Sequence, residues 1–70
     1  MRDVNRLDNI YDTIKELHKY AVPDWRFGQF MLNFITWYYN KYARDIFYIE
    51  DDKIIKIFKE FLNDVGIKYI

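Results

Sequence analysis

Few side chains in this 70-residue sequence could carry out covalent or metal chemistry. Cysteine and serine are absent, so Thr13 and Thr36 are the only hydroxyl candidates for a nucleophile apart from tyrosine. His18 is the single histidine, and no histidine or carboxylate follows it four residues later to share a metal ion. We therefore predict a packing or helix-end role for His18. We expect no enzyme activity, no metal and no cofactor.

Carboxylates are numerous, and the most concentrated run is Glu50, Asp51 and Asp52. Paired acids can perform acid–base chemistry when burial raises the pKa of one of them. The run directly precedes a helical pattern, however, and acidic residues at a helix start interact favourably with the helix dipole. This favours helix capping over a catalytic or cation-binding role. The two glycines are isolated from each other, which excludes a glycine-rich phosphate loop.

The charge pattern offers one candidate surface for nucleic acid. Eleven basic and eleven acidic residues give a formal net charge of zero, so the chain lacks the long-range positive field of sequence-independent binders. Lysines nevertheless recur every three residues along the third helical segment, at Lys53, Lys56 and Lys59. Two further cations, Lys41 and Arg44, precede that segment. Evenly mixed charge on a solvated helix face explains this pattern equally well. Nucleic-acid binding therefore stays an alternative, and we regard it as the less favoured one.

The most informative stretch is residues 23–39, which contains both tryptophans and is apolar around most of a helical circumference. Such a helix is either the buried centre of a bundle or an interface for a partner. One narrow polar stripe crosses it, with aromatic residues at its edge. The mixture of amide, guanidinium and ring side chains is typical of interface hot spots. The predicted protein-binding residues are Arg26, Gln29, Phe30, Asn33 and Trp37. The alternative is a solvated edge, with Phe30 and Trp37 covered by a loop.

Periodicity predicts the elements that position this stretch. A one-sided apolar pattern indicates a first helix from Asp3 to about Tyr20, with Asp3 or Asn5 as its cap. Pro23 ends it, and Asp24 is a suitable N-cap for the second helix. Gly28 within that helix costs about 1 kcal/mol relative to alanine. We expect a closely crossing helix or a partner backbone to compensate for this cost.

A ten-residue segment, residues 40–49, breaks the helical pattern, and its aromatic content predicts an ordered loop folded over the helices. The third helix should begin with Glu50 or Asp51 as its cap. It should end at Gly66, with Ile67 contacting the last turn as in a Schellman motif. The tail, residues 68–70, is expected to dock against the domain.

These elements predict an all-α fold: a single domain, residues 1–70, built as a compact bundle of three helices with an ordered aromatic loop between the second and third. The second helix should be central, because each of the others has only one narrow apolar face. No signal peptide or transmembrane span is evident, so a cytoplasmic location is expected.

Several short motifs resemble small uncharacterised helical proteins of bacteria and their prophages. They are Pro-Asp at 23–24, Arg-Phe-Gly-Gln-Phe at 26–30 and the segment 45–52, which together form a PDxRFGQ…DxFYIEDD pattern. The chain is also distantly similar to the YihD-like family of short helical proteins. The resemblance covers roughly residues 5 to 62 and carries no settled activity. It implies a mobile-element context, in which small inhibitors of host defence are common.

The sequence thus predicts a small, non-enzymatic protein–protein interaction module that binds itself, as a homodimer, or a partner protein. The predicted interface is the aromatic helix, residues 24–39, with the loop at residues 42–49. The alternatives are a phage-type inhibitor of a host defence protein and a nucleic-acid binder that uses the lysines of the third helix. We expect neither a membrane association nor a small-molecule substrate.

Overall fold

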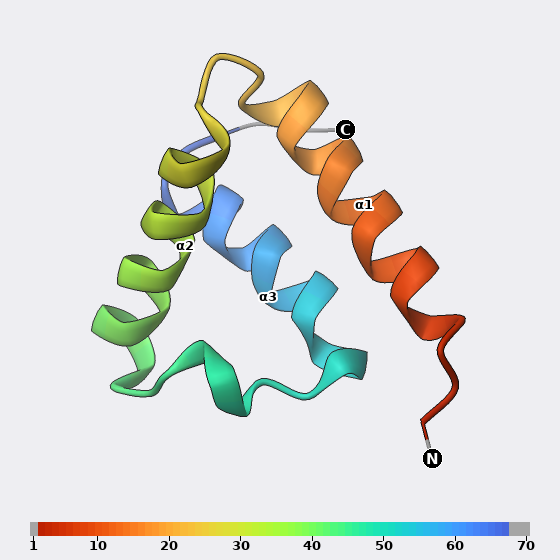
Figure 1. Cartoon of the computed structure of the whole chain (residues 1–70). Helices are drawn as coiled ribbons and strands as arrows, with labels where there is room; N and C mark the ends of the chain where they lie inside the picture. The colour runs from red at the N-terminus through yellow and green to blue at the C-terminus, as the bar shows by residue number, and fades with distance from the viewer. Residues whose placement is uncertain (1, 68–70) are drawn as a thin grey trace.

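The computed structural model describes residues 2–67, and the helical periodicity of the sequence is realised in three α-helices. These are α1 (Arg6–Ala21), α2 (Phe27–Tyr42) and α3 (Asp51–Asp64), with a short 3-10 helix, η1 (Ile46–Tyr48), before α3 (Figure 1). Residues 2–67 contain no strand. The predicted all-α bundle of three helices is therefore confirmed.

The central helix is α3, and the prediction that the second helix is central was wrong. α3 lies between α1 and α2 (Figure 1), and the extensive helix–helix contacts are those of α3 with each of the other two. The reason is the side-chain composition of α3. Phe58, Phe61 and Leu62 lie within one turn of each other and are all buried, so α3 can fill the space between two neighbours.

The core is mainly aromatic. Rings from α2 interdigitate with rings from α3, and α1 adds a single buried leucine next to a valine of the following turn. The buried cluster consists of Leu17, Val22, Phe30, Phe34, Phe58, Phe61 and Leu62. Large rings remove much apolar surface from water per residue, which suits a domain with few core positions.

The first helix begins at Arg6 with Asn5 at the N-cap position, one of the two predicted caps, although the Asn5 side chain makes no capping bond. The side chain of Asp3 accepts a hydrogen bond from the backbone N–H of Asn5, at 3.0 Å. This local bond stabilises a turn over residues 3–5. The side chain of Arg6 then forms an ion pair with Asp51, which joins the start of α1 to the start of α3.

The second helix begins at Phe27, and the prediction that Asp24 caps it was wrong. The N-cap position is Arg26, which has extended backbone angles and no capping side-chain bond. Residues 22–25 instead form a turn in which Trp25 N–H donates to the Val22 carbonyl, at 3.1 Å. This turn places the Trp25 ring 6.2 Å from the ring of Phe61. Packing of Trp25 against the core thus takes precedence over the local cap.

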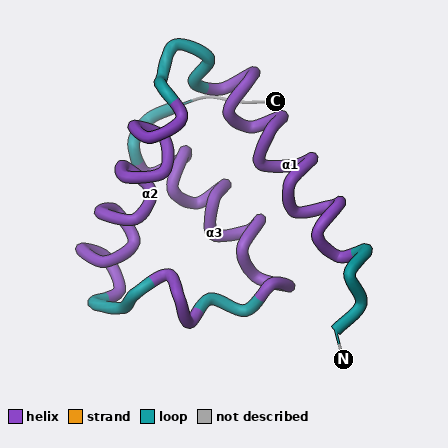
Figure 2. The backbone as a smooth tube through the Cα atoms, viewed as in Figure 1, coloured by secondary structure: helices purple, strands orange, loops and turns teal. Residues whose placement is uncertain are grey.

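The second helix also ends later than predicted, at Tyr42. Ala43 follows in the left-handed conformation, with φ 53°. The connection to α3 is consequently shorter than ten residues, and η1 occupies part of it (Figure 2). Asp45 starts η1 by accepting from the Phe47 N–H, at 2.9 Å. Ile46 and Ile49 pack against the core, which agrees with the expected ordered loop.

Both predicted ends of the third helix are confirmed. Glu50 is the N-cap residue, and Asp51 and Asp52 lie in the first turn. At the other end, Gly66 has φ 80°, and the Ile67 N–H donates to the Leu62 carbonyl at 2.9 Å. That bond pattern is a Schellman motif. The predicted docking of the tail falls on residues outside those that the structure describes.

Candidate protein-binding surface

The five residues predicted to bind protein occupy different environments. Arg26 and Gln29 are exposed at the start of α2, and Asn33 is half-buried one turn further on. Phe30 and Trp37 lie on the side of the helix that faces the core. The structure therefore does not bring the five together as one exposed patch.

Phe30 is a core residue with 0% exposure. Its ring stacks on the imidazole of His18, with centroids 4.5 Å apart, and contacts Phe58 on α3 at 5.5 Å. His18 is held in place because its Nε2 lies 2.7 Å from the Trp25 carbonyl oxygen. The packing role predicted for His18 is thus what the structure shows. A partner cannot contact Phe30 in this fold.

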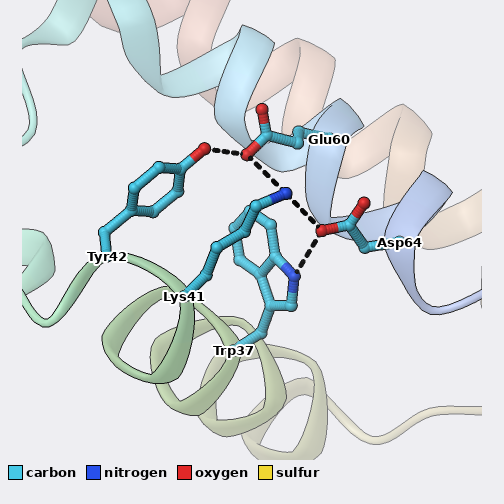
Figure 3. Close-up of polar contacts among 5 residues, drawn as sticks. All are labelled: Trp37, Lys41, Tyr42, Glu60 and Asp64. Carbon is cyan, nitrogen blue, oxygen red and sulfur yellow. Dashed lines mark hydrogen bonds and ion pairs between the residues drawn. The ribbon is translucent and has the colours of Figure 1, made fainter.

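Trp37 is half-buried and belongs to a polar cluster that joins α2 to α3 (Figure 3). Its indole Nε1 donates to Asp64 Oδ2 at 3.1 Å. The ammonium of Lys41 bonds the same oxygen at 2.6 Å and lies 3.4 Å from Glu60. The Tyr42 hydroxyl donates to Glu60. We call these five residues, Trp37, Lys41, Tyr42, Glu60 and Asp64, the α2–α3 polar cluster.

The electrostatics of this cluster follow from its hydrogen bonds. The bond from Lys41 lowers the pKa of the Asp64 carboxyl below its ordinary value, and the bond from Trp37 adds to that effect. The same contact raises the pKa of Lys41. The bond to Glu60 raises the pKa of Tyr42. The shifts of Asp64 and Lys41 both favour their charged forms at neutral pH, and the shift of Tyr42 favours its neutral, donating form. The arrangement is suited to holding two helices together.

These pKa shifts predict acid destabilisation. A carboxyl whose pKa is lower in the folded state stabilises the fold above its unfolded pKa of about 4, and that contribution is lost as the pH falls through the folded value. We expect the urea midpoint to fall as the pH is lowered below about 4. Asp64→Asn should lower the midpoint at pH 7 and show a smaller fall with acid than the wild type. Parallel pH profiles for the two proteins would contradict this role of Asp64.

The exposed apolar surface of α2 lies on the side opposite the core. Leu32, Ile35 and Tyr39 are 62%, 39% and 62% exposed, and their spacing of three and four residues puts them on one stripe. Gly28 continues this stripe by one turn. We call these four residues the outer face of α2. The sequence pattern predicts an apolar circumference for this helix but does not indicate which part of it the other helices cover.

The outer face of α2 extends toward η1. A hollow of about 280 Å³ lies beside the helix, with Ile35 and Tyr39 on one side and Ile46 on the other. Beyond it, Phe47 and Tyr48 are largely exposed and contact each other edge to face, with ring centroids 5.0 Å apart. Apolar side chains of the predicted loop interface therefore remain accessible.

A separate hollow gathers cations from two elements. Arg44, which follows α2, lies with Lys53 and Lys56 of α3 around a space of about 520 Å³, which Tyr42 and the carboxylate of Glu60 also line. All three belong to the candidate nucleic-acid surface that the sequence predicts, and the structure brings them together. Within residues 2–67, no group of three metal-ligating side chains occurs.

Comparison with known protein families, curated proteins and solved structures finds no match for this chain. The YihD-like resemblance accordingly stays a prediction. None of the helices in residues 2–67 has the length and apolar character that crossing a membrane requires.

Proposed function

We propose that this protein is a non-enzymatic protein-interaction module and that the outer face of α2 is its interface. The observation that supports this best is the exposure of Leu32, Ile35 and Tyr39 on a helix whose opposite side already forms the core. Single exposed apolar residues are common, whereas an aligned stripe of them is typical of interaction sites.

Gly28 gives the proposal further support. A Cβ atom built at this position would meet no atom within 4 Å, so no packing in the described chain requires glycine there. Gly28 is the second residue of α2, so glycine there costs less than it does in a helix interior, where the cost relative to alanine is about 1 kcal/mol. A partner backbone that approaches the outer face closely would compensate for that cost.

The test is the molar mass of the protein, by light scattering after size exclusion, over about a hundredfold range of concentration. A dimer at high concentration would make the partner a second copy, and Leu32→Glu should then give a monomer with an unchanged circular dichroism spectrum. Gly28→Ala should raise the thermal midpoint of the monomer and weaken the dimer. The matched control is Gln29→Glu, a similar charge change on the polar side of α2.

If the protein is a monomer at all concentrations, the outer face of α2 would bind a different protein and not a second copy. Capture of that protein from a host lysate should then be lost in Leu32→Glu and retained in Gln29→Glu. Equal capture by both variants would refute the outer face as the interface. The same experiment addresses the phage-type inhibitor, for which the captured protein would be a host defence component.

Nucleic-acid binding is the second candidate function, supported by the cations Arg44, Lys53 and Lys56 around one hollow. Phosphate contacts release counterions, so this function requires retention on heparin that weakens steeply with salt. Binding through the apolar outer face of α2 should be nearly independent of salt. The salt dependence of complex formation therefore separates the two candidates.

A further inference from the structure

A second surface of the molecule has a different chemistry from the outer face of α2. A groove of about 430 Å³ runs between α1 and the start of α2, on the α1 side of the core. Its volume lies within the range of sites that accept a ligand. We call it the α1–α2 groove. It shares no lining residue with the outer face of α2.

The floor and one wall of the groove are apolar and fixed in position. Ile14 and the stacked pair of His18 and Phe30 form the floor. Phe27, at the first position of α2, forms a wall and is 69% exposed. Because His18 is held by the Trp25 carbonyl and Phe30 is part of the core, the floor exists before any ligand arrives.

The opposite edge of the groove is cationic. Lys15 and Lys19 line it from successive turns of α1 and are both exposed. Neither forms an ion pair with a residue in 2–67, and the Nζ of Lys19 lies 5.5 Å from the centroid of the Tyr20 ring. Among the described residues, none that lines the groove is a carboxylate. Asp12 and Glu16 precede the two lysines by three residues on α1 but are not part of the lining, so the charge at the groove itself is positive.

We propose that the α1–α2 groove binds an acidic amphipathic segment of a partner protein. Apolar side chains of that segment would pack on Ile14 and Phe27, and its carboxylates would pair with Lys15 and Lys19. The charge complementarity selects an acidic partner over a basic or neutral one. An open groove between two helices suits a helical segment with anchors at every third or fourth residue.

The test is an NMR titration of the labelled protein with a synthetic peptide, acetyl-EELFDELLEE-amide. Amide shifts should be confined to residues 11–30 on the groove side. The peptide acetyl-KKLFKKLLKK-amide, which keeps the apolar anchors, should not bind. A version with serine in place of leucine and phenylalanine should also fail to bind.

Variants test the two halves of the site. Lys15→Glu/Lys19→Glu should weaken the acidic peptide by about tenfold or more, because two exposed charge pairs are reversed. Lys53→Glu/Lys56→Glu changes the net charge equally on α3 and should alter affinity by less than about twofold. Phe27→Ser, at an exposed position, should weaken binding without loss of the helical spectrum.

Four results would overturn the proposal. The first three are an absence of groove shifts at millimolar peptide, equal binding of the lysine peptide, and equal weakening by the two double variants. The fourth is a set of shifts on Leu32, Ile35 and Tyr39 of the outer face in place of the groove, which would support the proposed function. Loss of self-association in Leu32→Glu with intact peptide binding would show that the two surfaces act independently.

Discussion

Replacing Phe34 with alanine should leave most of the protein unfolded at 25 °C. The Phe34 ring is 1% exposed and stacks on Phe58, with centroids 3.8 Å apart and planes inclined by 10°. It also meets the edge of Phe61 at 5.6 Å. Truncation of such a ring costs about 3–5 kcal/mol. A core of this size supplies about 3–5 kcal/mol of net stability, so the loss consumes nearly all of it.

The measurement is chemical unfolding followed by far-ultraviolet circular dichroism. Phe27→Ala is the matched control, since it makes the same substitution on the same helix at an exposed position. It should change stability by less than about 1 kcal/mol. Phe34→Leu should lie between the two, because it keeps part of the buried volume. A folded Phe34→Ala protein with wild-type stability would show that the aromatic core is not arranged as described.

Trp37→Ala should have the second largest effect, and the effect should be on folding. The indole lies 5.5 Å from Phe61 and 6.1 Å from Phe34, between ring centroids, and its N–H bonds Asp64. Removal of the side chain opens the contact between α2 and α3. Because Trp37 is half-buried, we expect a loss of about 3 kcal/mol, at the lower end for large aromatic residues.

Trp37→Phe separates packing from hydrogen bonding. It keeps a ring against Phe61 and Phe34 but removes the donor to Asp64, so its loss of stability should be roughly half that of Trp37→Ala or less. Urea midpoints at pH 7 give the comparison. If Trp37→Ala instead kept full stability and lost only association, Trp37 would act as an interface residue, as the sequence-based prediction had it.

Signals confined to a few neighbouring residues made much of the fold predictable. The spacing of apolar residues identified three helices, and the termination of α3 at Gly66 followed from the one residue type that readily adopts a positive φ there. Glu50 at the start of α3 followed from the acidic run. Each of these features depends on backbone chemistry within about one helical turn, which a sequence displays directly.

Features that depend on packing between distant residues were not predictable. Asp24 is a good cap by type, but the turn that carries Trp25 to Phe61 displaces the helix start to Phe27. The central position of α3 likewise depends on which apolar faces meet. Periodicity shows that a face is apolar and leaves open which neighbour covers it.

The candidate site shows the same limit. Residues 23–39 were recognised as the aromatic segment, but Phe30 faces inward while Leu32 and Tyr39 face outward. In a helix that is apolar nearly all round, composition does not distinguish these two sides. The positions of α1 and α3 determine which side is buried. They cover the side that carries Phe30 and Trp37, and they leave the outer face of α2 exposed.

The α2–α3 polar cluster also contributes to the register of α3 along α2. If α3 slid by one turn, Ile54 and Ile57 would take the places of Phe58 and Phe61, so the contact would stay apolar but the rings packed on Phe34 would be lost. The same slip would bring Lys56 to the place of Glu60, where it would face Lys41, and two like charges in contact are destabilising. Glu60 would at the same time take the place of Asp64, so one ion pair of Lys41 would remain. Ring packing and the Lys41–Glu60 pair thus both favour the native alignment over this nearest competitor.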